Sequence, residues 1–194
     1  MVFAGVDEVG RGALAGPVTV AAVILPNDFE NEAGIKDSKL LSFQKRVYLS
    51  EYIKDKAVAF SIHSISVEVI DEINILQATM LGMQQALELL TVQPTKVLID
   101  GNYSTIKGYN VSTQVKADTF NTSVAAASIL AKVFRDNLMM ESLHLQYPQY
   151  HWKQNKGYAT LEHRQAIMQH NISPHHRKTF CKNILQQLEN ERLF

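Results

Sequence analysis

The stretch Asp7-Glu8-Val9-Gly10-Arg11-Gly12 closes an apolar run that begins at Met1. The run is typical of a buried strand, yet it finishes on two adjacent carboxylates and a glycine-flanked arginine. Ionised groups are costly to bury unless they are paired or hold a metal. The stretch therefore indicates a cation at the end of the strand. A solvated strand end followed by a tight turn is the alternative.

The composition is that of one α/β domain. The chain has 194 residues, 46% of them hydrophobic, which is enough for a sizeable core. The single cysteine, Cys181, excludes an intramolecular disulfide and favours a reducing compartment, so we expect the cytoplasm. The apolar runs are far shorter than the ~20 residues of a membrane span. Residues 1–4 leave no room for a removable leader before Asp7, so we expect a soluble protein that does not bind membranes.

Charge is distributed unevenly along the chain, although the net charge is zero. A neutral chain is not a general polyanion binder. Between His151 and Lys182, however, there are six Lys or Arg residues and one acid, whereas the remainder carries thirteen basic and eighteen acidic residues. An acidic body with a basic C-terminal part suits a metal in one place and a phosphate backbone in another. An ordinary solvated face is the alternative.

Hydrophobic patterns predict a mixed α/β fold that ends in helices. Strands are expected at 2–9, 17–25, 57–65, 96–100 and 109–115. Helices are expected at 42–56, at 66–90 in two pieces, at 123–145 with small residues on one face, at 160–170 and at 180–192. After Pro148 the sequence becomes polar, aromatic and basic. We therefore predict a core domain of residues 1–148 and a helical, substrate-contacting part of residues 149–194.

Three separated segments each place a carboxylate where a strand ends or a helix begins. They carry Asp7 with Glu8, Asp100, and Asp118. Oxygen ligands without a Cys/His cluster select hard cations such as Mg²⁺ or Mn²⁺. Two such ions roughly 4 Å apart can activate a water and stabilise the leaving oxygen in phosphodiester hydrolysis. Seen alone, Asp100 before Gly101 is a turn signal and Asp118 a near-cap residue, but together the acids predict a metal site.

Six motifs, in order along nearly the whole chain, resemble those of bacterial ribonuclease HII, the type 2 ribonuclease H. They are the opening Asp7 to Gly12, Asp37-Ser38-Lys39, Ile99-Asp100-Gly101-Asn102, Lys116-Ala117-Asp118, the helical Ala125 to Asp136, and Lys156-Gly157-Tyr158-Ala159-Thr160. The resemblance implies an α/β fold with a ribonuclease H-like mixed five-stranded sheet, its first three strands antiparallel. It also implies flanking helices and a C-terminal helical appendage.

The resemblance further implies a metal-dependent endonuclease. Such an enzyme hydrolyses RNA in RNA/DNA duplexes and incises 5′ of ribonucleotides embedded in DNA, leaving 5′-phosphate and 3′-hydroxyl ends. The four acids of the family fall on Asp7, Glu8, Asp100 and Asp118, which would hold two Mg²⁺ or Mn²⁺ ions. We expect a monomer that acts on RNA/DNA hybrid and on DNA containing ribonucleotides, and a replication clamp stays open as a partner.

Two other functions compete with this one. Ribonuclease HIII prefers longer RNA stretches and carries an extra N-terminal substrate-binding domain, for which the position of Asp7 leaves no room. A non-catalytic module that binds RNA/DNA duplexes has no use for four acids, because carboxylates only hinder the binding of a polyanion.

The substrate-binding residues are also implied by the resemblance. Gly10-Arg11-Gly12 falls on the loop whose backbone reads the ribose 2′-hydroxyl, and Tyr158 on the tyrosine that tests the RNA-to-DNA junction. Only a contact to the 2′-hydroxyl distinguishes RNA from DNA, and glycines let a backbone approach a sugar closely. For Tyr158 the alternative is a tyrosine that closes a turn after Gly157. Phosphate contacts that position without reading sequence are expected from Lys39, Lys132, Lys153 and Lys156, whereas an ordinary surface role is favoured for Arg46.

Three positions need separate treatment. Ala117 and Asn155 stand where the family usually has Gly and His. Asp136 lies about five helical turns beyond the fourth acid, so we expect a structural role and not a metal ligand.

Glu8 raises a geometric question. Consecutive strand residues point to opposite faces, so Asp7 and Glu8 reach one metal only if the strand already ends at Glu8. We expect Asp7 to be the central bridging ligand.

Overall fold

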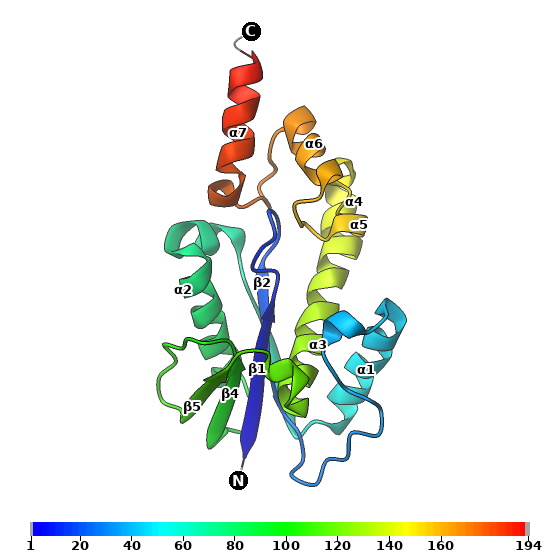
Figure 1. Ribbon diagram of the computed structural model, residues 1–194, viewed down its shortest axis with the longest axis vertical. Helices are drawn as coiled ribbons and strands as arrows, with labels where there is room; N and C mark the ends of the chain where they lie inside the picture. The colour runs from blue at the N-terminus through cyan, green and yellow to red at the C-terminus, as the bar shows by residue number, and fades with distance from the viewer. Residues whose placement is uncertain (1, 193–194) are drawn as a thin grey trace.

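Five strands form one mixed sheet in the order β3-β2-β1-β4-β5 (Figure 1). This arrangement comes from a computed structural model, which describes residues 2–192. Strand β1 pairs antiparallel with β2, and β2 with β3, whereas β4 runs parallel to both β1 and β5. The mixed five-stranded sheet is confirmed, and each strand ends within two residues of its predicted limits. The strands are β1 Phe3–Val9, β2 Val18–Ile24, β3 Ala59–Ile65, β4 Lys96–Asp100 and β5 Val111–Gln114.

Helices cover both faces of the sheet (Figure 1). Alternate residues of β2 face opposite layers, so Ala21 and Val23 pack with one set of helices and Val20 and Ala22 with the other. Burial on both faces explains why β2 is a continuous apolar run. The covering helices are α2, Val67–Glu88, on one face, and α1, Phe43–Lys56, with α3, Thr122–Asn137, on the other.

Helix α2 is broken at Asn74, as the prediction of two pieces required. Asn74 has φ 68° and ψ 164°, which is not helical. Its side-chain Oδ1 accepts hydrogen bonds from the backbone N–H groups of Leu76 and Gln77, at 3.0 and 3.1 Å. Asn74 therefore caps the second piece by supplying acceptors for its free N–H groups.

Helix α3 lies unusually close to β1. A Cβ built on Gly5 would stand 2.3 Å from the carbonyl carbon of Ser123. The alanines of α3 are fully or almost fully buried, which confirms that its small-residue face packs on the sheet. Short segments complete this half of the chain: η1 Ser38–Leu40, η2 Ala117–Thr119, and, directly after α3, the π-helical η3 Leu138–Leu143 with α4 His144–Gln146.

The C-terminal helices gather at the end of the molecule away from the N terminus (Figure 1). Their core includes Leu14 and Ala15, from the loop after β1, beside Tyr150 and Trp152. This core joins residues on both sides of position 148, and a domain boundary there stays a prediction. None of the described helices is long and apolar enough to cross a membrane. The C-terminal elements are η4 Pro148–Tyr150, α5 Trp152–Asn155, α6 Leu161–His170 and α7 Lys178–Arg192.

Replacing Gly5 with alanine should destabilise the protein, because the added methyl group meets the backbone of α3. We expect the free energy of unfolding to fall by about 1–3 kcal/mol, the usual cost of overpacking a core. Urea unfolding measures it. Gly12→Ala is the control, since a Cβ there has no heavy atom within 4 Å. Equal losses in the two variants would contradict the role given to Gly5.

Candidate active site

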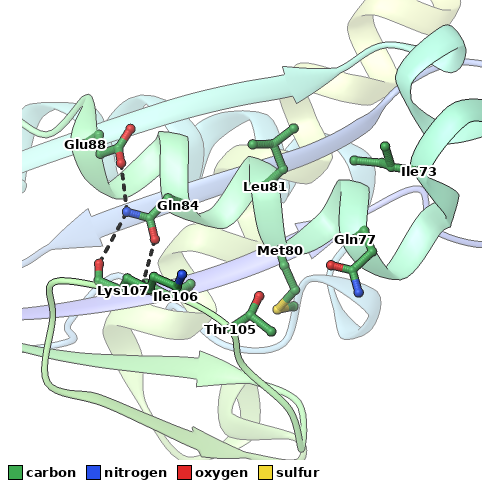
Figure 2. A pocket seen from close by; sticks show the side chains of 9 residues that line it. All are labelled: Ile73, Gln77, Met80, Leu81, Gln84, Glu88, Thr105, Ile106 and Lys107. Atoms are coloured by element: carbon green, nitrogen blue, oxygen red, sulfur yellow. Dashed lines mark hydrogen bonds between the residues drawn. The ribbon is translucent and has the colours of Figure 1, made fainter.

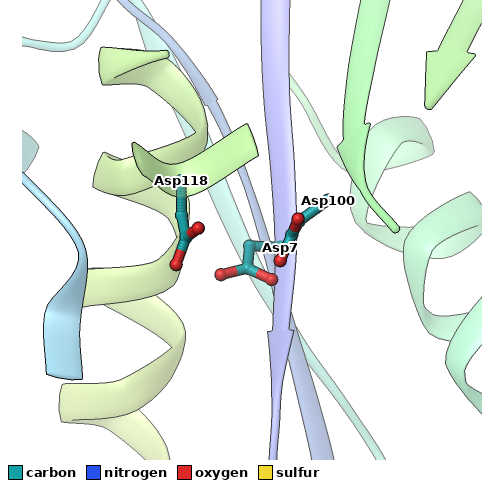
Figure 3. A group of neighbouring side chains, drawn as sticks. All are labelled: Asp7, Asp100 and Asp118. Carbon is teal, nitrogen blue, oxygen red and sulfur yellow. The ribbon is translucent and has the colours of Figure 1, made fainter. Parts of the chain in front are cut away.

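Three carboxylates from distant parts of the chain converge at one end of the sheet (Figure 3). One oxygen from each of Asp7, Asp100 and Asp118 lies within 4.8 Å of the other two. Strands β1 and β4 are parallel neighbours with Val6 paired to Ile99, so the next residues, Asp7 and Asp100, stand at the same level. Asp118 arrives from η2. The sheet register and the position of η2 together bring into proximity three of the four acids predicted from sequence.

A backbone contact fixes η2 beside β4. The N–H of Ala117 donates to Asp100 Oδ1 at 2.9 Å, and Lys116 has φ 60° at the start of this turn. Ala117 is fully buried, so its methyl group fits where the family usually has glycine. The donor to Asp100 is the main-chain N–H of position 117, which alanine and glycine supply equally well.

Burial makes the ionised carboxylates costly. It raises the pKa of Asp7 well above its usual range, and the negative charges of Glu8 and Asp100 raise it further, while a hydrogen bond from Ser128 lowers it. The pKa of Asp118 is likewise raised by burial and by Asp37 and Asp100, against the opposing effect of Lys39. Lys39 Nζ lies 3.9 Å from Asp118 Oδ2, which is buried and has no hydrogen-bond partner.

These groups fit a bound divalent cation. Three carboxylate oxygens converge, the pKa values of Asp7 and Asp118 are raised, and Asp118 Oδ2 has no hydrogen-bond partner. The site therefore needs more positive charge than Lys39 provides, and a hard cation supplies it. Asp7 and Asp118 are only 5% and 4% exposed, so solvent does little to screen them.

The structure does not bring Glu8 into the three-acid group. Strand β1 continues through Glu8, which pairs with Val20, to Val9. Alternation then turns Glu8 away from the face of Asp7. Its Oε1 lies 3.4 Å from Arg11 Nη1, whereas Oε2 is buried without a hydrogen-bond partner. The charge of Asp100 raises the pKa of Glu8, after the larger effect of burial. Glu8 therefore borders the site from the other side, and its role as a ligand stays a prediction.

The loop Gly10-Arg11-Gly12 is shaped by a side chain beneath it. Gly10 has φ 92°, and a Cβ there would stand 2.2 Å from Arg135 Nε. A Cβ added at Gly12 would have no heavy atom within 4 Å, so that residue borders open space. Arg11 is exposed. The need for glycine at position 10 is thus explained by internal packing.

Two buried arginines, which the sequence did not single out as structural, hold this loop. Arg177 donates to the carbonyl oxygens of Gly10, Arg11 and Gly16, at 2.7–3.0 Å. Burial lowers its pKa to about 9. Its place in a basic segment suggested a phosphate-binding surface, and this interpretation is wrong for Arg177, which is 0% exposed. The second is Arg135, whose Nε donates to the carbonyl of Pro17 at 2.9 Å.

The predicted substrate residues around Tyr158 form a cluster of their own. Lys132 Nζ lies 5.7 Å from the centre of the Tyr158 ring and pairs with Asp136 Oδ1 at 2.8 Å. Asp136 is buried in this pair, in keeping with the structural role expected for it. Lys156 Nζ donates to the carbonyl of Lys153, and burial lowers the pKa of Lys156.

Asn155 has a clear structural task. Its Oδ1 accepts from the N–H of Gly157 at 2.8 Å, and its Nδ2 donates to the carbonyl of Tyr150 at 2.8 Å. The side chain thereby closes the turn that presents Tyr158, and it is an amide that does so at the position where the family usually has histidine.

Arg46 is not an ordinary surface residue. Its Nη1 donates to the carbonyls of Ser38 and Leu41, at 3.0 and 2.6 Å. Arg46 thus fixes the segment that carries Lys39, which itself is exposed. Lys153 is exposed as well.

Two buried histidines, His163 and His176, pack behind the turn that presents Tyr158. Trp152 Nε1 donates to His163 Nε2 at 3.0 Å, so His163 carries its proton on Nδ1 and donates to the carbonyl of Tyr158 at 2.9 Å. Ser173 N–H donates to His176 Nδ1, which leaves the proton of His176 on Nε2, 3.1 Å from His163 Nε2. Both rings are neutral in this arrangement.

A separate hollow of about 550 Å³ lies between α2 and residues 105–107 (Figure 2). Gln84 bridges its walls, since its Nε2 donates to Glu88 Oε1 at 2.7 Å and its Oε1 accepts from the N–H of Lys107 at 3.0 Å. None of the three converging acids lines it, so it lies outside the carboxylate site.

Comparison with known proteins identifies the family. The model of the family described as Ribonuclease HII matches residues 4–183. The chain belongs to the ribonuclease HII family. A ribonuclease HII of Parabacteroides distasonis is 53% identical over 178 residues, covering 91% of this chain and 88% of the relative. That of Christiangramia forsetii is 46% identical over 178 residues, covering 91% and 89%.

Solved structures agree with this assignment. Ribonuclease H2 of Pyrococcus horikoshii OT3 superposes with a TM-score of 0.81 at 26% identity, covering 97% of this chain and 99% of that one. A Bst-RNase HIII variant shares the fold, with a TM-score of 0.79 at 19% identity, but only 70% of it is covered. The chain is therefore a ribonuclease H-type endonuclease with the ribonuclease H-like fold, and ribonuclease HIII is not the better match.

Replacing Asp7 with asparagine should stabilise the metal-free protein. A raised carboxyl pKa means that the ionised form opposes folding at pH 7. We therefore expect the free energy of unfolding in EDTA, measured by urea unfolding, to be higher for the variant than for the wild type. Mg²⁺ or Mn²⁺ should raise the melting temperature of the wild type more than that of the variant. Asp28→Asn removes an exposed carboxylate as the control; a loss of stability in Asp7→Asn would contradict the prediction.

The buried histidines should make the fold sensitive to acid. Burial lowers the pKa of His176 to about 3, whereas an unfolded histidine titrates near 6.5. Below pH 6.5 the unfolded chain therefore binds a proton that the folded chain does not. The stability that the neutral His176 contributes to the fold is fully present above pH 6.5. It is lost as the pH falls toward 3, at up to about 1.4 kcal/mol per pH unit. Between pH 7 and 4.5, the melting temperature of His176→Asn should fall less with decreasing pH than that of the wild type. An equal fall in the two proteins would refute this prediction.

Proposed function

We propose that this enzyme incises DNA duplexes on the 5′ side of embedded ribonucleotides and hydrolyses RNA in RNA/DNA hybrids, leaving 5′-phosphate and 3′-hydroxyl ends. The observation that carries the proposal is the convergence of Asp7, Asp100 and Asp118 at the end of the strand that leads into the loop 10–12. A group that selects ribose thus follows directly on the strand that carries a hydrolytic site, so recognition and cleavage act on neighbouring parts of one nucleotide.

The converging acids, with Glu8 on the adjoining face, would hold two Mg²⁺ or Mn²⁺ ions. Bound there, such ions activate a water and stabilise the leaving oxygen. Ser128 hydrogen-bonds to Asp7 and lies 3.0 Å from the hydroxyl of Ser38, so it orients the central carboxylate. A Bst-RNase HIII structure, 19% identical and similar in fold, is a complex with Mn²⁺. Our choice of hard cations depends on the oxygen-only donor set.

Substrate recognition is assigned to the elements that surround the acids. The backbone of Gly10-Arg11-Gly12 would read the 2′-hydroxyl, and the ring of Tyr158 would pack on the deoxyribose that follows. Lys39 lies beside Asp118, whereas Lys132 lies beside Tyr158. These cations and Lys156 would contact phosphates, which position the duplex without reading its sequence.

The enzyme is proposed to act as a monomer in the cytoplasm. A replication clamp is a candidate partner, because a similar structure, with a TM-score of 0.79 at 28% identity over 94% of this chain and 96% of that one, is the PCNA:RNase HII complex of Archaeoglobus fulgidus.

A nicking assay tests the proposed function. With Mg²⁺ or Mn²⁺, the wild type should cut a DNA duplex that carries one ribonucleotide, on its 5′ side, and Asp7→Asn should lose at least about 10³-fold in rate, because the central ligand is gone. Asp28→Asn should retain the wild-type rate. Undiminished cutting by Asp7→Asn would refute the metal site, and tight hybrid binding without turnover in any divalent metal would favour a binding module.

A duplex with four ribonucleotides, assayed in parallel, separates this activity from that of ribonuclease HIII. Cutting of the longer RNA stretch alone would contradict incision at single ribonucleotides.

A further inference from the structure

Arg135 lies between the two elements that are proposed to read the substrate. It extends from α3, is 0% exposed, and donates from all three nitrogens of its guanidinium. Nε donates to the carbonyl of Pro17 at 2.9 Å and Nη2 to that of Ala15 at 3.0 Å, both in the loop after β1. Nη1 donates to the carbonyl of Lys156 at 2.9 Å, in the turn before Tyr158. One side chain thus holds both segments.

The same guanidinium also contacts the reading groups themselves. Its Cζ lies 5.4 Å from the centre of the Tyr158 ring, within the range of a cation–π contact. On the loop side, Gly10 approaches so closely that a Cβ there would stand 2.2 Å from Nε. Arg135 is therefore in contact with both Gly10 and Tyr158.

Backbone contacts show that the two segments form one unit. The N–H of Leu14 donates to the carbonyl of Gly157 at 2.8 Å. A Cβ on Gly157 would lie 2.4 Å from the carbonyl oxygen of Ala15, so no side chain fits between them. Within the described chain neither Arg135 nor Arg177 pairs with a carboxylate in a salt bridge, so backbone carbonyls are what satisfies them.

We propose that Arg135 is a positioning residue that sets the spacing between the loop 10–12 and the ring of Tyr158, and so determines selectivity for a single embedded ribonucleotide. The inference rests on the proposed function of these two elements. A ribonucleotide and the deoxyribonucleotide after it are adjacent in one strand, so their two readers act together only at a fixed separation. A planar guanidinium reaches three carbonyls in three directions, which a lysine ammonium on a flexible stem does not reproduce.

Arg177 provides a matched comparison. It is equally buried, but its side-chain donors bind only Gly10, Arg11 and Gly16 of the first segment. Arg177→Lys should loosen the ribose-reading loop alone. Every substrate needs that loop, so cleavage of one-ribonucleotide and four-ribonucleotide duplexes should fall by the same factor. Arg135→Lys should lower kcat/KM for the one-ribonucleotide duplex by a further factor on the order of 10 to 100, the effect of a misplacement of about 1 Å.

A double-mutant cycle with Tyr158→Ala gives the decisive readout. In the wild-type and Arg177→Lys backgrounds, Tyr158→Ala should reduce the ratio of single- to four-ribonucleotide cleavage by the same factor. In the Arg135→Lys background it should change the ratio little, because the tyrosine is already out of place. The melting temperature of each variant shows whether it is folded. The inference is overturned if Tyr158→Ala lowers the ratio by its full wild-type factor in the Arg135→Lys background, or if Arg135→Lys reduces cleavage of both substrates equally.

Two further results keep the test informative. If Arg135→Lys does not fold, Gly157→Ala takes its place, since the added methyl group pushes the same segments apart, and it should cause the same loss of selectivity. An unchanged ratio in a folded Gly157→Ala overturns the inference. If Tyr158→Ala leaves the ratio of single- to four-ribonucleotide cleavage unchanged in the wild-type background, the proposed role of the tyrosine is refuted. If Tyr158→Ala lowers this ratio by the same factor in the wild-type and Arg135→Lys backgrounds, only the proposed role of Arg135 is refuted.

Discussion

Helix α3 lies directly on β1 because position 5 carries no side chain, and the rest of the site depends on that contact. Along its length, α3 presents Ser123 to Gly5, Ser128 to Asp7 and Arg135 to Gly10. A helix held further from the sheet would leave Asp7 without its hydrogen bond and the loop after β1 without its support. Close packing of α3 on β1 thus aligns the carboxylate site with the ribose-reading loop.

Buried charge is stabilised differently near Asp7 and near Arg135, at the two ends of the contact between α3 and β1. Around Asp7 the carboxylates repel one another, and burial together with this repulsion raises the pKa values of Asp7 and Asp118, so their ionised forms oppose folding until a cation binds. Each guanidinium nitrogen of Arg135 and Arg177 donates to at least one backbone carbonyl. Those carbonyls are in place only when the loop is folded. The guanidiniums therefore order the loop, whereas the acids retain the capacity to bind a ligand.

Sequence patterns predicted most elements and the convergence of three acids, because strand ends and small-residue helix faces are local properties. Asp7 and Asp100 could be placed together once β1 and β4 were parallel neighbours. The same patterns misjudged Arg177, since a basic residue among histidines and lysines looks exposed until the fold buries it. Arg46 was misjudged too, because its carbonyl partners are positioned by the turn at Ser38 and Leu41.

By itself, the sequence determined the family, the order of the elements and the identity of the acids, because these follow from residue types and their spacing. The motif that opens the chain already joined two carboxylates to a glycine-flanked arginine. Only the tertiary structure decided that Asp7 joins Asp100 and Asp118 while Glu8 faces away. It also decided that Arg135 binds both the loop after β1 and the turn before Tyr158. Such facts depend on strand register and on contacts between residues far apart in the chain, neither of which a local pattern encodes.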